Sequence, residues 1–126
     1  LDEQIAGEVT KAADTSKSII QANDDIVGMY GSNEAAASGI VQGAEETGKD
    51  VTIVGFDSGK TQIDAIKSGK EAGAVTQSPV KIGYYTVKAA VAALNGAELP
   101  TVIDSGFAWY DKSNIDTDAI KANLYE

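Results

Sequence analysis

Strand-like and helix-like segments alternate along most of this sequence, and that alternation limits the possible folds more than any other feature. Short apolar runs, typical of buried strands, are each followed by a segment with apolar residues at helical spacing. Helices that connect successive strands in this way pack on a sheet of parallel strands. The predicted fold class is therefore α/β, with a parallel sheet flanked by helices on both faces. The strands are expected at 26–31, 51–56 and 72–77, and the helices at 10–22, 34–47, 60–69, 80–96 and 116–125.

Residues at the ends of these segments suit helix caps and turns. Asn33 can cap the helix that follows it, because its side-chain oxygen can accept a backbone N–H that lacks a partner. Gly48 can end the same helix in a left-handed turn. Pro100 opens a last extended run at 101–110, and residues 1–6 have weak strand character. The pattern fits a single domain.

The composition narrows the possible functions. The 126 residues carry a net charge of −9, which is a poor match for a nucleic-acid backbone or an anionic membrane surface. All 10 basic residues are lysines, so the planar fork with which arginine binds carboxylates and phosphates is absent. Histidine and cysteine are absent too, which removes the usual general base, the thiol nucleophile and most zinc sites. No apolar run has the length of a membrane span. We therefore expect no enzyme activity, no cofactor, no nucleic-acid partner and no membrane insertion.

Residues 53–61, IVGFDSGKT, look like a phosphate-binding loop, but the spacing is wrong. Such a loop has four residues between its first glycine and the Gly-Lys pair, whereas three separate Gly55 from Gly59. Val54 stands where the first glycine is needed, and Asp57 would place a negative charge among the phosphates. Nucleotide binding is therefore disfavoured, and Asp57 needs another role.

Polar residues follow the three predicted strands at the points where the strands end: Asn33, Asp57 and Gln77. The carboxyl ends of parallel strands share one edge of a sheet, and ligands of open α/β folds bind there. Two amides and a carboxylate can donate to and accept from the hydroxyls of a neutral sugar or polyol. Phe56, directly before Asp57, can lay an apolar face against sugar C–H groups.

Each of these four residues also has a purely structural interpretation. Asn33 can serve only as a helix cap, and Asp57 only as a turn residue. Gln77 can be a solvated strand end, and Phe56 can belong to the core. A two-carboxylate acid–base pair would require Glu34 to join Asp57. The pattern by itself leaves these alternatives open.

Most of the chain resembles the C-terminal half of a bacterial sugar-binding protein of the ABC-transporter type, in the ribose-binding-protein-like, type I periplasmic group. The resemblance is carried by residues 25–49, 51–96 and 104–116. Its most specific features, taken together and in this order, are VGFD at 54–57, Gln-x-Pro at 77–79 and NID at 114–116.

The resemblance implies two α/β lobes joined by three crossings, with a sugar enclosed between them. Residues 1–126 would be the C-terminal lobe, while helix 80–97 would belong to the other lobe. The residues that match the family's sugar-binding positions are Asn33, Asp57 and Gln77, with Phe56 in an aromatic position beside them.

The resemblance also implies a biological setting. We expect a solute-binding component that captures a monosaccharide or polyol and delivers it to an ABC-transporter permease. Its location would be extracytoplasmic, in the periplasm or lipid-anchored on the outer face of a Gram-positive cell. The N-terminal lobe is missing from this sequence, so we expect a fragment with about half of a binding site.

A second function class shares the same core fold. The effector-binding domain of a sugar-responsive LacI-type transcription regulator would carry a DNA-reading segment ahead of the sensor. Residues 72–79, AGAVTQSP, resemble the transporter group more closely. The net charge also disfavours a DNA-bound partner.

Overall fold

The structure is a computed structural model, and it describes residue 4 and residues 7–125. Apart from Gln4, the strand expected at 1–6 lies outside the described residues. The elements alternate as predicted, in the order α1 Val9–Ala22, β1 Gly28–Tyr30, α2 Glu34–Thr47, β2 Thr52–Phe56, α3 Lys60–Ser68, β3 Gly73–Gln77, α4 Pro79–Leu94, β4 Phe107–Asp111 and α5 Asp118–Lys121.

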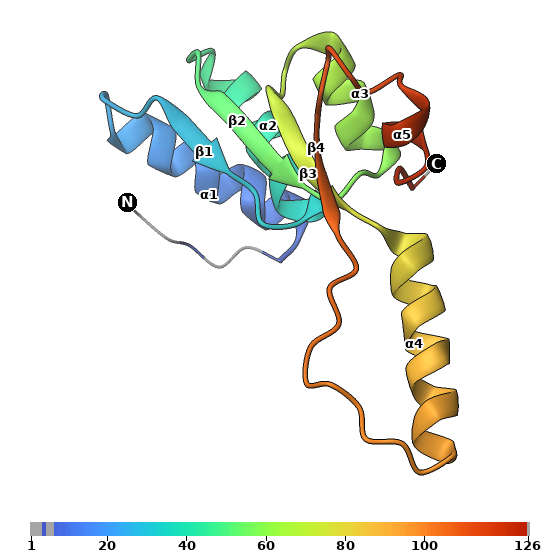
Figure 1. Ribbon diagram of the computed structural model, residues 1–126. Coiled ribbons are helices and arrows are strands. Elements are labelled where there is room, and N and C mark those ends of the chain that lie inside the picture. The colour runs from blue at the N-terminus through green and yellow to red at the C-terminus, as the bar shows by residue number, and fades with distance from the viewer. Residues whose placement is uncertain (1–3, 5–6, 126) are drawn as a thin grey trace.

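The four strands form one sheet in the order β1-β2-β3-β4 (Figure 1). β1 pairs with β2 and β2 with β3 in parallel, as the sequence predicted. β4 pairs with β3 antiparallel, so the sheet is mixed. The chain leaves the carboxyl end of β3 through α4 and returns to the same end, which forces β4 to run back along β3.

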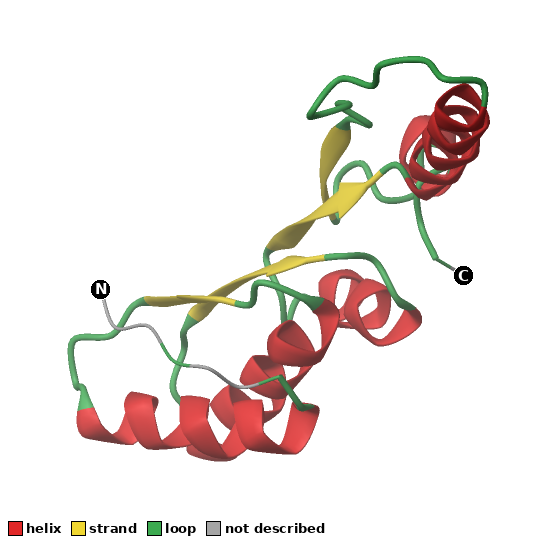
Figure 2. Ribbon diagram, turned by 90° about the horizontal axis from the view of Figure 1, so that it is seen from below, coloured by secondary structure: helices red, strands yellow, loops and turns green. Residues whose placement is uncertain are grey.

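The helices α1, α2 and α3 lie on one side of the strands (Figure 2). Gly55 of β2 shows why they share that side. A Cβ added there would lie 3.0 Å from Ala37 of α2 and would also collide with Gln62 of α3. Since side chains alternate between faces, the neighbours of Gly55 in β2 point to the opposite side, which no described helix covers. The α/β class is confirmed, but the described part of the chain packs helices on one face only.

The expectation that segment 26–31 is a buried strand is wrong. Val27 is 79% exposed and Tyr30 is 58% exposed. Met29, which points to the face opposite Tyr30, packs against buried side chains between the sheet and the helices. β1 is the end strand of the sheet, and its outward face has no covering layer among the described residues.

Two groups of buried side chains hold the helices on the sheet. The first joins α1 and α2 to β2 and contains Ile20, Ile40, Val41, Ala44, Val51, Ile53 and Ala65. The second joins α3 and α5 to β3 and β4 and contains Ile63, Ile66, Ala74, Tyr110, Ile115 and Ile120. Ile63 and Ile66 thus place one side of α3 in the core.

The two predicted ends of α2, Asn33 and Gly48, are confirmed, and Gly69 ends α3 in the same way as Gly48 ends α2. The Ala36 N–H donates to the Asn33 side-chain oxygen at 2.8 Å, so Asn33 caps α2. Gly48 ends α2 with φ 68°, and Gly69 ends α3 with φ 83°, both in the left-handed region. The terminal helix is shorter than expected, because 116–125 contains only the single turn of α5.

Helix α4 projects away from the sheet, and a long segment returns beside it to β4 (Figure 1). It has 16 residues, none of them buried. Its apolar side chains include Val80, 75% exposed, Val87, 65% exposed, and Leu94, 88% exposed. Ile82 lies on nearly the opposite side of the helix, and a helix with apolar residues on opposite sides is typical of one packed inside a larger structure.

Candidate ligand-binding site

Asp57 and Gln77 meet at the carboxyl ends of β2 and β3, as the strand pattern predicted. The Gln77 side-chain amide donates to Asp57 Oδ1 at 3.1 Å. The backbone N–H of Glu34 donates to Asp57 Oδ2 at 3.2 Å, which brings the start of α2 to the same place. Asn33 directly precedes Glu34. The structure therefore brings Asn33, Asp57 and Gln77 to one edge of the sheet, and we call these three residues the rim.

The backbone of Asp57 has an unusual conformation. Its φ is 80°, and it is the one non-glycine residue with positive φ in the described part of the chain. Two contacts hold it there: its N–H donates to the Val75 carbonyl at 2.9 Å, and the Tyr110 hydroxyl donates to its carbonyl at 2.7 Å. Aspartate tolerates this region better than most residues, but the conformation still costs about 1–3 kcal/mol. Such strain is typical of functional positions.

Asn33 and Phe56 lie next to this contact. The Asn33 oxygen is used by the helix cap, but its amide nitrogen makes no hydrogen bond with the described residues and its side chain is exposed. Phe56 is half-buried, on the face of β2 opposite Gly55, so it does not belong to the core between sheet and helices. Both side chains remain available to a ligand at the rim.

The second carboxylate at this edge has a different environment. The Glu34 carboxylate lies against Gly59, where an added Cβ would collide with it. Gly59 is the N-cap of α3, and the positive end of a helix dipole stabilises a negative charge. The Glu34 carboxylate thus lies at the start of α3, whereas the Asp57 carboxylate accepts from the Gln77 amide.

Two tyrosines near Asp57 stay neutral well above physiological pH. Burial raises the pKa of Tyr110, and the nearby carboxylates Glu71, Glu34 and Asp57 raise it further. Partial burial, followed by Asp57, raises the pKa of Tyr125. Tyr125 was not anticipated from the sequence, yet its hydroxyl lies 3.5 Å from Asp57 Oδ1. No motif marks it, because only the folded C-terminal segment brings it to the rim.

The rim offers acceptors from a carboxylate and both donors and acceptors from amides, which is the set that sugar hydroxyls require. In the described residues, no group of three or more histidine, cysteine or acidic side chains could hold a metal ion. We also find no described helix with the length and apolar character of a membrane span.

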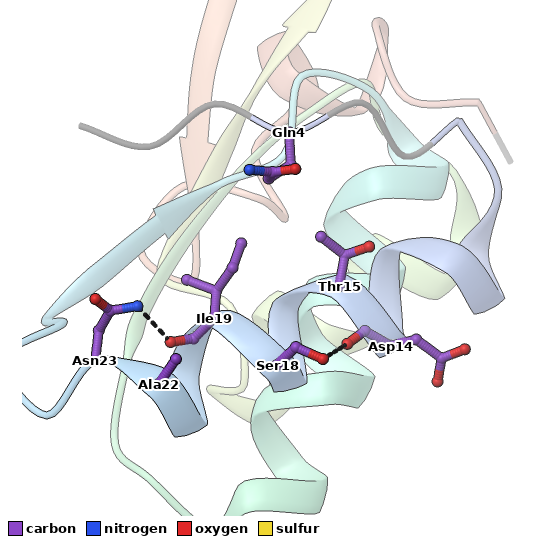
Figure 3. Close-up of a pocket in the computed structure, with 7 residues that line it drawn as sticks. All are labelled: Gln4, Asp14, Thr15, Ser18, Ile19, Ala22 and Asn23. Atoms are coloured by element: carbon purple, nitrogen blue, oxygen red, sulfur yellow. Dashed lines mark hydrogen bonds between the residues drawn. The ribbon is translucent and has the colours of Figure 1, made fainter.

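Two hollows lie near α1, and neither contains Asp57 or Gln77. Figure 3 shows one beside α1, where Asn23 donates to the Ile19 carbonyl and Ser18 to the Asp14 carbonyl. These contacts satisfy the helix's own backbone. A larger hollow between α1 and β1 reaches Asn33 but neither Asp57 nor Gln77. Neither of these two hollows includes the contact between Asp57 and Gln77.

An aspartate with a strained backbone and two amides thus lie together at the strand ends of an α/β sheet. The chain belongs to the periplasmic binding protein family, because the model of the periplasmic binding protein domain matches residues 2–98. The resemblance found in the sequence is therefore confirmed at the level of the family.

Individual relatives agree with this assignment. The chain is 29% identical over 96 residues to the ribose import binding protein of Bacillus subtilis, covering 76% of this chain and 32% of that protein. A solute-binding protein of an Agrobacterium vitis ABC transporter, solved with α-D-tagatopyranose, matches with TM-score 0.92 and 32% identity. That match covers 100% of this chain and 43% of the other.

A third match bears on the alternative function. A Brachyspira murdochii protein described as an ABC transporter, LacI family transcriptional regulator, is 38% identical with TM-score 0.76, covering 92% of this chain and 40% of the other. The chain thus spans about a third of the curated relative described above and well under half of each solved structure.

Proposed function

We propose that the protein is the solute-binding component of an ABC transporter and that it captures a small neutral sugar or polyol between two lobes. This chain forms the C-terminal lobe, residues 1–126. The observation that carries the proposal is the hydrogen bond between Gln77 and Asp57 at the strand ends. Sequence relatives that import ribose and a structural relative that holds tagatopyranose support it.

The rim residues have distinct roles in this proposal. Asp57 accepts hydrogen bonds from two sugar hydroxyls, while Gln77 orients its carboxylate and offers an amide of its own. The free amide nitrogen of Asn33 donates to a third hydroxyl. Phe56 covers C–H groups of the sugar ring. Binding involves no covalent step.

The second lobe supplies the other half of the contacts. A sugar whose hydroxyls form hydrogen bonds with both lobes binds the closed state more tightly than the open one. It therefore shifts the population toward the closed state. The C-terminal lobe alone offers only part of these contacts. We expect this chain by itself to bind sugar weakly or not measurably.

Helix α4 fits the second lobe rather than this one. None of its residues is buried, although most of its side chains are apolar. In this proposal the chain crosses from Gln77 through Ser78 into α4, packs helix 80–97 in the other lobe and returns to β4. The closed protein then delivers its sugar to a permease at the outer face of the cytoplasmic membrane.

A thermal-shift screen of the full-length natural protein tests the proposal. The panel contains D-ribose, D-tagatose, other pentoses and hexoses, and linear polyols. We expect at least one member to raise the melting temperature of the wild-type protein and to lose that effect in Asp57→Asn. A panel in which no sugar or polyol stabilises the protein would contradict the proposal.

The regulator function remains the second candidate, favoured by the Brachyspira match. It predicts a DNA-binding segment ahead of this lobe and sugar-dependent DNA affinity. The full-length natural protein can be titrated against genomic DNA fragments with and without the sugar found above. Sugar-sensitive, sequence-specific DNA binding would favour the regulator, and sugar binding without DNA binding would favour the transporter.

A further inference from the structure

The last residues of the described chain cross the carboxyl ends of β2 and β3. We call residues 122–125 the C-terminal strap. Asn123 joins it to the sheet through three hydrogen bonds: its carbonyl accepts from Thr76 Oγ1 at 3.0 Å and from Ser58 Oγ at 3.3 Å, and its side-chain oxygen accepts from Ser78 Oγ at 2.8 Å. The strap is therefore bonded to both strand ends.

The partners of Asn123 are direct neighbours of the rim residues. Ser58 follows Asp57, while Thr76 and Ser78 stand on either side of Gln77. Ser58 and Thr76 are both fully buried, and their hydroxyls lie 2.9 Å apart. Asn123 thus holds the backbone on either side of Gln77 and directly after Asp57.

Tyr125 extends the strap to the rim itself. Its backbone N–H donates to the Ser58 carbonyl at 3.2 Å, which fixes the residue beside Asp57. Its hydroxyl lies 3.5 Å from Asp57 Oδ1, the oxygen that also accepts from Gln77 at 3.1 Å. A separation of 3.5 Å is at the outer limit of a hydrogen bond, so the hydroxyl is free to take a better partner.

The exposure of Tyr125 separates a packing role from a binding role. The side chain is 39% exposed, whereas Tyr110, which also contacts Asp57, is fully buried. Tyr125 instead leaves its hydroxyl at the open edge, next to the carboxylate of the proposed site.

We propose that Tyr125 is a ligand-contacting residue of the sugar site and that Asn123 is a positioning residue for Asp57 and Gln77. This inference rests on the proposed function. One sugar hydroxyl donates to Asp57 Oδ1 and accepts from the Tyr125 hydroxyl, which replaces the loose contact between the two side chains. The C-terminal strap thereby selects sugars that carry a hydroxyl at this position.

Isothermal titration calorimetry of the full-length natural protein tests the inference, with the panel sugar that gives the largest thermal shift as the probe. Tyr125→Phe removes one hydroxyl and keeps the ring. We expect the wild-type melting temperature without sugar and a dissociation constant raised about 2- to 13-fold, the factor of one neutral hydrogen bond. Tyr84→Phe is the matched control, because Tyr84 stands on α4, away from the rim, and its side chain is 61% exposed.

Deoxy analogues of the same sugar, one for each hydroxyl, separate contact from positioning. For Tyr125→Phe the loss of affinity should vanish with one analogue, the one that lacks the contacted hydroxyl. For Asn123→Ala the loss should be similar with every analogue, because the whole rim shifts.

The outcomes distinguish a failure of the proposed sugar-binding function from a failure of the role proposed for Tyr125. A wild-type protein that binds no sugar overturns the proposed function and this inference together. Sugar binding that is unchanged in Tyr125→Phe overturns the inference and leaves the function standing. A Tyr125→Phe loss that is equal for every deoxy analogue overturns direct contact.

Discussion

The amide of Gln77 donates to the carboxylate of Asp57 at 3.1 Å, although twenty positions of chain separate the two residues. The contact exists because β2 and β3 are adjacent and parallel, so their carboxyl ends meet. It orients the Asp57 carboxylate at the open edge of the sheet. The binding properties expected of the lobe depend on this pair.

Replacing the Asp57 carboxylate should weaken sugar binding strongly. Asp57→Asn keeps the shape of the side chain but removes the charge and one acceptor. Hydrogen bonds to a charged group contribute about 1.5–3 kcal/mol, so we expect the dissociation constant to rise about 10- to 150-fold. Calorimetry with the panel sugar measures it. Asp64→Asn is the control, because that carboxylate pairs with Lys60 on the exposed side of α3.

The two roles of Asn33 can be separated by two substitutions. Asn33→Asp retains the oxygen that caps α2 but loses the free amide nitrogen, so stability should hold while sugar affinity falls. Asn33→Ala loses both functions, and we expect the free energy of unfolding to fall by about 1 kcal/mol as well. Urea denaturation and calorimetry on both variants check this. Equal affinity for wild type and Asn33→Asp would show that Asn33 is only a cap.

Tyr110 should stabilise the strained backbone of Asp57. Its hydroxyl donates to the Asp57 carbonyl from a fully buried position. Tyr110→Phe leaves that carbonyl without this donor, and we expect a loss of about 1–3 kcal/mol in the free energy of unfolding. Urea denaturation measures the loss, with the exposed Tyr84→Phe as control. A Tyr110→Phe variant as stable as the control would show that the bond contributes nothing.

Gln62 and Glu71 form a buried polar pair beneath β2. Gln62 donates to Glu71 Oε1 at 2.9 Å, and both side chains are almost fully buried. The two other oxygens, Gln62 Oε1 and Glu71 Oε2, have no hydrogen-bond partner within the described residues. Burial raises the pKa of Glu71 to about 7, and the bond from Gln62 offsets part of that rise. A protonated Glu71 supplies a donor that this pair otherwise lacks.

The protein should therefore lose stability as the pH rises toward neutrality. Glu71 binds its proton more tightly in the folded state than in the unfolded state, where its pKa is 4.5. The stability that this tighter proton binding contributes is fully present below pH 4.5. It is lost as the pH rises through about 7, and the free energy of unfolding falls by about 3 kcal/mol. Urea denaturation across this range should show the decline in the wild type and its absence in Glu71→Gln. A control such as Glu98→Gln, at an exposed residue, should follow the wild type.

Local chemistry explains why much of the fold could be predicted. Asn33 and Gly48 mark the ends of α2 through a side-chain acceptor and a left-handed backbone, and both signals depend only on neighbouring residues. The short apolar runs predicted which residues form the parallel strands. Strand ends that are neighbours in a parallel sheet then had to bring Asp57 and Gln77 together.

The features that were missed depend on contacts between distant segments. The antiparallel β4 follows from where α4 returns, and the sequence pattern does not encode that point. From the sequence alone, Gln62 and Glu71 look like two solvated polar residues. They lie against β2 because Gly55 has no side chain and leaves room for both. Tyr125 reaches Asp57 only because Asn123 ties the C-terminal strap to two strand ends.

A crystal structure of the full-length natural protein with its best-stabilising sugar tests the central claim most directly. We expect sugar hydroxyls at hydrogen-bond distance, about 3 Å, from the Asp57 carboxylate and the Gln77 amide, with α4 packed in the second lobe. A sugar bound elsewhere, for example in the hollow between α1 and β1, with Asp57 and Gln77 bonded only to each other, would contradict it.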